Sequence, residues 1–260
     1  GARLLNRTTR TMELSADGKT FYYYAKQMLK LNRDSLFALT RANQDEKSIN
    51  IVATPHTSRY YLTSKIVEFR REHPETSFNI TVCYNSEIHN KLRAGEFEFA
   101  FCNMKIMDSD YAVRHYSSSS LVVITPNTER FRSLSDGRFP KELFGQEPLI
   151  TRSSTSALQL EFLRWVKQNL PETKLHVVTA IDDTETIKQL VADGMGISVL
   201  SEVAVGEFVA SGRLLSFPLE GTMPHHLYFV SKKKYLSPEQ TAFRDFILQS
   251  APIAEKAEEE

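Results

Sequence analysis

The chain has 260 residues, of which 41% are hydrophobic and 25% are charged, a composition typical of a globular protein with one large or two medium domains. Its formal net charge is zero, yet the first 33 residues hold seven basic groups against two acidic ones, which suggests a polyanionic partner, with a solvated helix face as the alternative. No run of about 18 apolar residues and no amino-terminal export signal occur, so we expect no membrane partner and a cytoplasmic location.

Residues from Ser15 to about Asn43 are predicted to form one long helix, because Ser15 is a good N-cap and no proline interrupts the stretch. Some 28 residues at about 1.5 Å each span about 42 Å, which is longer than one small domain can cover. Two adjacent apolar stripes run along this helix, and the first has coiled-coil spacing. We therefore expect one stripe to contact a second copy of the chain, with an ordinary buried helix as the alternative. The stripe predicted to dimerise consists of Tyr22, Ala25, Leu29, Leu36 and Leu39.

After the polar stretch that ends near residue 47, strands and helices alternate, a pattern typical of parallel sheets with right-handed crossovers. The chain divides into two such α/β units. In the first unit, strands are predicted at 48–55, 77–84 and 98–103, and helices at 57–74 and 86–97. In the remainder, strands are predicted at 117–126, 147–154, 175–181, 196–200 and 225–235, and helices at 155–170, 183–194 and 237–251.

Three segments together resemble the family of LysR-type transcriptional regulators. The opening "RLLNRTTRTMELSADGK" is similar to the wing of the family's winged helix-turn-helix, with Leu5 in place of the usual Phe and Ser15 in place of Thr. "SINIVATPHTSRYYLTSKIVEFRREHP" is similar to the first strand and helix of its effector domain, and "TIKQLVADGMGISVLSEVAV" to its late helix, turn and strand. The wing positions that fit the family pattern are Arg3, Leu4, Arg7, Arg10, Leu14 and Gly18.

This resemblance implies a regulator, not an enzyme, that binds DNA, a small-molecule effector and further copies of itself as a homodimer or homotetramer, with no cofactor. It implies an α/β fold in which a partial winged-helix wing and a long linker helix precede a periplasmic-binding-protein-like domain of two parallel-sheet lobes. The recognition helix precedes the wing in this family, so the sequence is expected to start inside the DNA-binding domain. The wing residues expected to contact DNA phosphates are Arg3, Arg7, Thr8 and Arg10. The expected divisions are 1–15 (wing), 16–46 (linker and dimerisation helix), 47–250 (effector domain, lobe I about 47–116 and 224–250, lobe II about 117–223) and 251–260 (acidic tail).

Two hydroxyl-rich helix starts, near residues 54–58 and 153–155, indicate where an effector binds. Ligands of open parallel sheets lie beyond the carboxyl ends of the strands, where free backbone N–H groups and the helix dipole favour an anion. Arg152 and His56 could neutralise a small anion or carboxylate, although Ser and Thr also cap many helices that bind nothing. The predicted effector-binding residues are Thr54, His56, Thr57, Ser58, Asn103, Ser153, Ser154, Thr155, Thr179 and Thr184.

The sequence argues against three other classes of protein. A periplasmic-type solute-binding protein shares the two-lobed fold but would need an export signal and neither a basic wing nor a long amphipathic helix. An enzyme is not favoured, because no Gly-x-Ser-x-Gly, phosphate-binding glycine-rich loop or His-Glu-x-x-His motif occurs. No metal site is expected either, since the seven histidines are scattered, or adjacent and facing opposite ways at His225 and His226. A redox sensor is disfavoured because Cys83 and Cys102 lie in predicted core strands of the first lobe, whereas the sensing cysteines of such relatives belong to the second.

Overall fold

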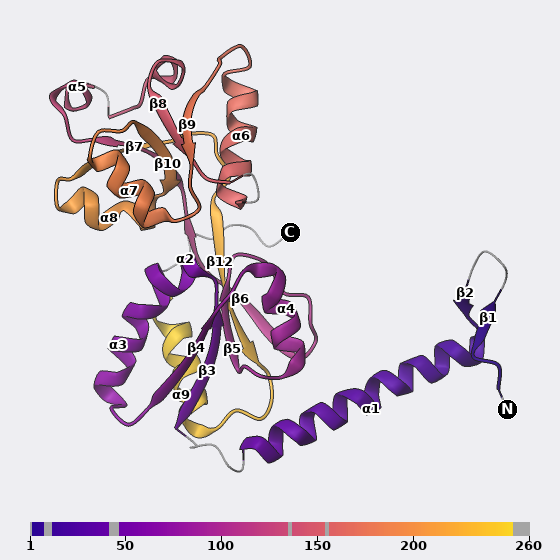
Figure 1. Ribbon diagram of the computed structural model, residues 1–260. Helices are drawn as coiled ribbons and strands as arrows, with labels where there is room; N and C mark the ends of the chain where they lie inside the picture. The colour runs from indigo at the N-terminus through magenta and orange to yellow at the C-terminus, as the bar shows by residue number, and fades with distance from the viewer. Residues whose placement is uncertain (1, 8–11, 42–46, 135–136, 154–155, 252–260) are drawn as a thin grey trace.

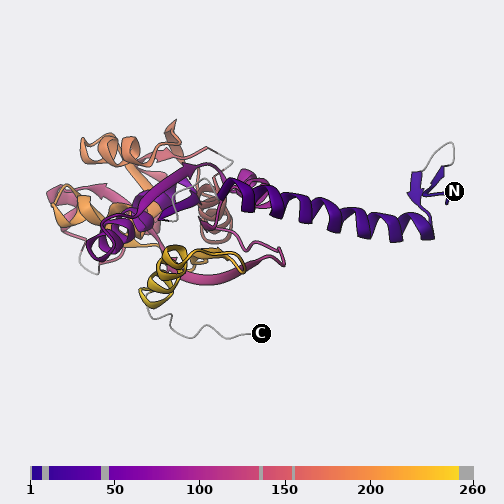
Figure 2. The same cartoon turned by 90° about the horizontal axis from the view of Figure 1, so that it is seen from below.

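A computed structural model describes residues 2–7, 12–41, 47–134, 137–153 and 156–251. Two α/β lobes, each built on a five-stranded sheet, lie one above the other, and helix α1 (Ala16–Arg41) extends away from them (Figures 1 and 2). The hairpin of β1 (Leu5–Arg7) and β2 (Met12–Leu14) sits at the far end of α1. The prediction of an α/β fold with two lobes and a long preceding helix is thereby confirmed.

Lobe I is the part built on the sheet that β3 begins. β3 pairs in parallel with β4 and β5, as predicted, whereas β12 runs antiparallel to both β5 and β6. The sheet is therefore mixed: the order of strands and helices predicts its parallel part, and β12 and β6 add an antiparallel side. Strand β6 was not predicted as a separate strand, and only its Ser-rich end falls within the predicted strand at 117–126. In order across the sheet the strands are β4 (Ser77–Val82), β3 (Ser48–Ala53), β5 (Phe99–Cys102), β12 (His225–Lys232) and β6 (Tyr111–Ser119).

Lobe II is built on a second mixed sheet. β8 pairs in parallel with β10 and β9, and β7 pairs antiparallel with β10 and β11. Strand β11 and the helix that precedes it, α8 (Glu202–Ala210), were not predicted. The strands in order are β11 (Leu214–Pro218), β7 (Leu121–Pro126), β10 (Ile197–Ser201), β8 (Pro148–Thr151) and β9 (His176–Ala180).

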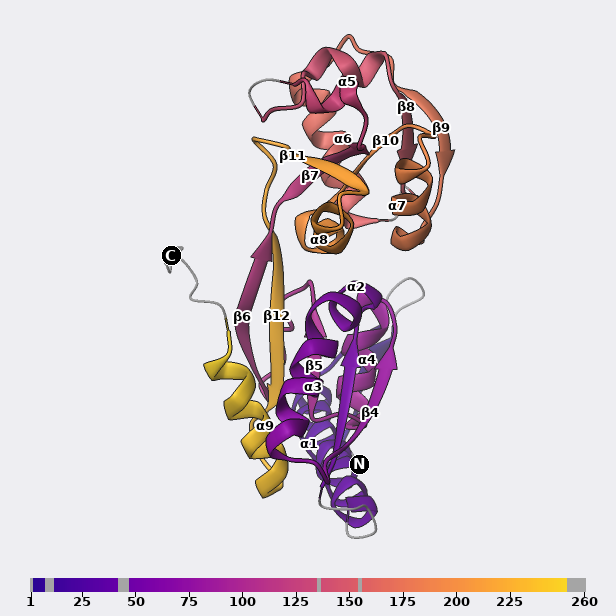
Figure 3. The same cartoon turned by 90° about the vertical axis from the view of Figure 1, so that its left-hand side faces the viewer.

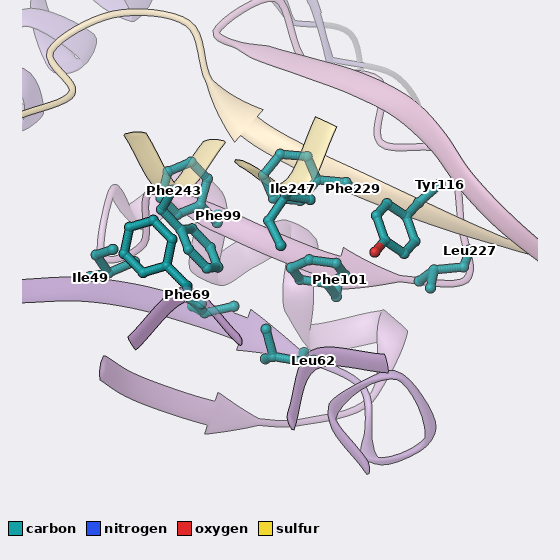
Figure 4. Packing of buried hydrophobic residues seen from close by; sticks show 12 residues of the cluster. Ile49, Leu62, Phe69, Phe99, Phe101, Tyr116, Leu227, Phe229, Phe243 and Ile247 are labelled. Carbon is teal, nitrogen blue, oxygen red and sulfur yellow. The ribbon is translucent and has the colours of Figure 1, made fainter. Parts of the chain in front are cut away.

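Helices cover both faces of each sheet, so alternate residues of the central strands enter two separate cores. On one face of the lobe I sheet, Phe99, Phe101 and Phe229 pack with Phe69 and Phe243 of the covering helices (Figure 4). The helices of lobe I are α2 (Pro55–Thr57), the π-turn η1 (Ser58–Leu62), α3 (Thr63–Glu72), α4 (Asn85–Ala94) and α9 (Pro238–Gln249). Those of lobe II are α5 (Glu129–Arg132), the 3-10 turn η2 (Lys141–Gly145), α6 (Ala157–Asn169), α7 (Thr184–Ala192) and α8.

Strands β6 and β12 run side by side toward lobe II (Figure 3). The chain enters lobe II at Ser120, directly between β6 and β7, and returns to lobe I through the segment before β12. We call β6 and β12 the connecting strands. The predicted lobe boundary near residue 117 falls within β6.

Helix α1 begins where the sequence predicts, because the Ser15 hydroxyl accepts a hydrogen bond from the Gly18 backbone N–H at 2.9 Å. Gly18 lies so close to the hairpin that a Cβ there would be 1.9 Å from the carbonyl oxygen of Leu4. The side chain of Arg3 donates to the backbone oxygen of Leu5 at 3.1 Å. No helix in the described ranges is both long enough and apolar enough to span a bilayer. Residues Thr8 and Arg10, the side chains of Arg7, Leu36 and Leu39, and the tail 252–260 lie outside what the structure describes.

Candidate ligand-binding site between the two lobes

A pocket of about 500 Å³ lies between the lobes, at the carboxyl ends of parallel strands from both sheets. Thr54 follows β3, Asn103 follows β5, Arg152 follows β8, and Asp182 comes shortly after β9. This is where open parallel sheets place their ligands, and the volume suits a small metabolite. The lining residues are Thr54, Pro55, His56, Tyr84, Asn85, Ser86, Asn103 and His225 of lobe I and Arg152, Ser153, Ser156, Ala157, Leu158 and Asp182 of lobe II.

The hydroxyl groups on the lobe I wall bond mainly to one another and to the backbone. Thr54 and Thr57 form a capping box at the start of α2, in which each backbone N–H donates to the other's hydroxyl, at 3.0 and 3.2 Å. The Thr57 hydroxyl donates to the carbonyl oxygen of Phe101 at 2.7 Å, and its side chain is fully buried. The Thr54 hydroxyl also contacts the Asn103 side-chain oxygen at 3.2 Å. This wall is thus held in place by hydrogen bonds that need no ligand.

The lobe II wall carries a positive charge, the guanidinium of Arg152. Its Nη1 donates to the Thr184 hydroxyl at 2.7 Å and its Nη2 to the Asp182 carbonyl oxygen at 2.9 Å, while its buried Nε has no hydrogen-bond partner among the described residues. Within the same residues, no carboxylate oxygen lies within 4.0 Å of this guanidinium. The Asp182 carboxylate accepts from the Ser153 backbone N–H at 3.2 Å and is exposed, so solvent screens its charge.

The first turn of α6 adds backbone donors to the same wall. Its N-cap, Ser156, makes no side-chain capping bond, and Ser156, Ala157 and Leu158 all line the pocket. The first N–H groups of a helix lack partners within the helix and attract anions. Arg152 and the start of α6 therefore present positive potential to one end of the pocket.

Two histidines of lobe I line the pocket as neutral rings at physiological pH. The pKa of His56 is lowered to about 4, chiefly by burial and further by the charges of Arg152 and His225. Burial also lowers the pKa of His225, against the opposing charge of Glu161, and the buried Nε2 of His225 has no hydrogen-bond partner within the described part of the chain. Neutral imidazoles can donate or accept a hydrogen bond, which suits a ligand hydroxyl or carbonyl.

The lobes also touch through a cluster of polar side chains, which we call the interlobe latch. The Tyr60 hydroxyl of lobe I donates to the Glu185 carboxylate of lobe II at 2.7 Å, and Arg59 forms an ion pair with the same oxygen at 2.9 Å. Within lobe II that oxygen also accepts from Lys188 at 2.8 Å, and Lys188 is 2% exposed. Burial opposes ionisation of Glu185, but hydrogen bonds from Lys188, Tyr60 and Arg59 leave its pKa below the usual value. Glu185 thus holds one element of each lobe in contact.

The structure brings only part of the predicted effector-binding set to the pocket. Thr54, His56, Asn103 and Ser153 line it. The other described members do not, for distinct reasons: Thr57 turns into the core, Ser58 lies in the π-turn, Thr179 lies in edge strand β9, and Thr184 lies behind Arg152 as its hydrogen-bond acceptor. Ser154 and Thr155 fall outside the described residues.

Sequence reasoning missed several lining residues. Asn85, Ser86 and Asp182 follow strands β4 and β9, so the rule that ligands lie at carboxyl strand ends could have found them. His225 opens strand β12, which runs antiparallel to its neighbours, and its amino end therefore reaches the same edge. No local pattern in the sequence predicts that β12 runs antiparallel to its neighbours.

Two α/β lobes with a ligand-sized pocket between them define a class of small-molecule-binding domains. Residues 42–252 match the family model described as LysR substrate binding domain. The chain belongs to this LysR family, which confirms the resemblance found in the sequence.

Curated relatives and solved structures agree with this assignment. The chain is 27% identical over 198 residues to the HTH-type transcriptional activator CmpR of Synechocystis, an alignment that covers 75% of this chain and 64% of CmpR. It is 22% identical to the HTH-type transcriptional regulator CitR of Bacillus subtilis, over 94% of this chain and 83% of CitR. The chain thus spans less than two thirds of the length of CmpR.

Among solved structures, the fold is similar to the Synechocystis CcmR regulatory domain in complex with 2-PG, with a TM-score of 0.64, 20% identity, and 80% of this chain and 98% of that chain covered. The effector binding domain of QuiR in complex with shikimate gives a TM-score of 0.60 at 17% identity, covering 78% of this chain and 96% of that one. These likenesses confirm the two-lobed fold.

Proposed function

We propose that this chain senses a small organic anion in the interlobe pocket and transmits its binding to DNA as part of a LysR-type transcriptional regulator. The observation that carries the proposal is Arg152, a guanidinium at the pocket wall with no carboxylate within ion-pairing distance in the described structure. A buried or half-buried charge is costly unless it is paired, so an anion that enters the pocket gains both a charge partner and the donors of α6.

The rest of the lining defines the other end of the ligand. His56 and His225 are neutral and offer hydrogen bonds to an uncharged polar group. A carboxylate or phosphate that also bears a hydroxyl or carbonyl group would engage both walls. Structures of this fold have been solved with 2-PG in CcmR and with shikimate in QuiR, which supports small organic acids as the class to test.

The experiment is a thermal-shift screen of small carboxylates and phosphates, 2-PG and shikimate included, followed by calorimetry on those that raise the melting temperature. We expect Arg152→Gln to weaken the binding of each positive compound about 100-fold, because a charge-assisted pair is lost. Arg138→Gln is the matched control, since Arg138 is an exposed arginine of the same lobe that pairs with Glu220. An undiminished affinity in Arg152→Gln, or a panel with no positive compound, would count against the proposal.

Oligomerisation is proposed to use α1. This helix exposes large apolar side chains along its length, among them Phe21, Tyr22, Leu29 and Leu31 at 53%, 52%, 63% and 68%. Such a contiguous apolar surface on a long helix favours packing against a second copy of the same helix. Light scattering of the chain should give a dimer or tetramer, and Leu29→Glu should shift it to a smaller species, whereas Lys19→Glu on the same helix should not.

The basic hairpin is proposed to contact DNA phosphates through Arg3, Arg7, Thr8 and Arg10. A ligand that prefers one arrangement of the lobes would then change how the oligomer presents these hairpins to DNA.

We further propose that the protein acts in the cytoplasm by binding and not by catalysis, since its relatives are named as transcriptional regulators. A solute-binding protein of the same fold would have no use for the apolar surface of α1.

A redox-sensing role is not supported by the thiols. Burial raises the pKa of Cys102 to about 11 and also raises that of Cys83, so both stay protonated and unreactive near neutral pH. Alkylating reagents are therefore expected to leave the response to the effector unchanged.

A further inference from the structure

The connecting strands contain an irregularity that gathers three polar side chains on their outer face. His226 of β12 pairs with Ser118 of β6, and Tyr228 of β12 pairs with His115 of β6. Between these two pairs, β12 advances by two residues while β6 advances by three. Strand β6 therefore holds one extra residue at this point, which is a β-bulge. In a regular strand His115 and Ser118 would face opposite sides, whereas the bulge brings both beside His226.

The three side chains meet at close range. His115 Nε2 lies 2.8 Å from Ser118 Oγ, Ser118 Oγ lies 2.9 Å from His226 Nδ1, and the two ring nitrogens lie 3.3 Å apart. Two imidazole nitrogens bound to one tetrahedral zinc ion, each at about 2.0–2.1 Å, are about 3.3–3.4 Å apart. The spacing of these two ring nitrogens thus matches that of two ligands of a single metal ion.

The Ser118 hydroxyl is compatible with the same centre. The three interatomic distances leave a point, out of the plane of the three atoms, that is about 2 Å from each of them. A metal ion at that point would keep its remaining position open to water, because this face of the connecting strands is exposed.

The affinity of this site for a metal ion depends on its two imidazoles. In the described residues no group of three or more His, Cys, Asp or Glu side chains is placed to hold a metal, so the affinity here rests on two imidazoles. Imidazole pairs select zinc, nickel and copper over magnesium and calcium.

We propose that His115 and His226 bind a divalent transition-metal ion of the zinc class, with Ser118 Oγ and water completing its coordination. The site joins β6 to β12, the two strands that lead from lobe I toward lobe II, so a bound ion cross-links them. The sequence could not reveal it, because 111 residues separate the two histidines and only the bulge brings them together.

The test is calorimetric titration of the full chain, free of any polyhistidine tag, with Zn²⁺ at pH 7.5. We expect one ion per chain with micromolar affinity, and a loss of about tenfold or more in His115→Ala and in His226→Ala. Ser118→Ala should lose less than either. The control is His176→Ala, because His176 is an exposed histidine of β9 in lobe II, and it should bind as the parent does.

Thermal unfolding supplies the second readout. Without metal, the two histidine variants should melt close to the parent, since His115 is exposed and His226 is only partly buried. With Zn²⁺, only the parent and the His176→Ala control should gain thermal stability, because only they bind the ion in the native state. Zinc affinity that is the same in the parent and in His115→Ala/His226→Ala would overturn the proposal.

Discussion

The two walls of the pocket have similar residue types and different roles. On the lobe I wall, the Thr54 hydroxyl bonds to Asn103 and to Thr57, whose own hydroxyl turns inward to the Phe101 carbonyl. On the lobe II wall, the buried Nε of Arg152 has no hydrogen-bond partner among the described residues, and the N-cap Ser156 of α6 makes no side-chain capping bond. A hydroxyl at a helix start is therefore poor evidence for ligand binding by itself, whereas a charge without a carboxylate partner is better evidence.

The largest effect on stability is expected at Glu185, which holds the two lobes together. Glu185→Ala removes the carboxylate that Tyr60, Arg59 and the buried Lys188 share. Removing one partner of a buried ion pair costs about 3–5 kcal/mol, and we expect about 3 kcal/mol, because Lys188 keeps its bond to the Ala204 carbonyl and Glu185 is 34% exposed. Urea unfolding measures the loss. A change below about 1 kcal/mol would mean that the latch contributes no more than a surface pair.

The next effect separates the two walls directly. Thr57→Val deletes a buried hydroxyl and leaves the Phe101 carbonyl without that donor, so we expect about 2 kcal/mol less stability. Because the Thr57 side chain does not line the pocket, the ligand affinity of the folded protein should change less than threefold. Arg152→Gln should show the reverse pattern, with a large loss of affinity and a small change in stability. If both variants lose affinity equally, the two walls do not differ as described.

The smallest effect is the pH dependence that His56 contributes. Its pKa is about 4 in the folded protein and ordinarily 6.5, so the unfolded chain takes up the proton first as the pH falls. Stability from this group is complete above about pH 6.5 and is lost as the pH drops toward 4. Between pH 7 and pH 5 the loss should be about 1–2 kcal/mol. His56→Asn should flatten that part of the profile, and an unchanged slope would exclude His56 as its source.

The sequence predicted those features that depend on local patterns. Ser15 at the start of α1, the apolar runs of β3 and β5, and the position of the pocket beyond strand ends all follow from short-range rules. The direction of β12 and the existence of β6 depend on pairing between residues more than 100 positions apart, which no local pattern encodes.

Among the site residues, too, local patterns predict the position along the chain, and long-range contacts decide which way a side chain points. His56 and Ser153 were found because they follow strands at helix starts, yet Thr57 has the same local signature and turns inward. Its direction is decided by the Phe101 carbonyl, which a neighbouring strand supplies. The sequence therefore locates this edge of the pocket but not which hydroxyls face it.

The contact between Gly18 and Leu4 has a mechanical consequence. Because there is no room for even a methyl group between them, the hairpin packs directly against the start of α1. The 26 residues of α1 form an arm of about 39 Å. A tilt of about 10° at the end nearest the lobes would swing the hairpin by about 7 Å, roughly two base-pair steps along a duplex. A small angular change at one end of this arm thereby becomes a displacement of several ångströms of the hairpin that we propose to contact DNA.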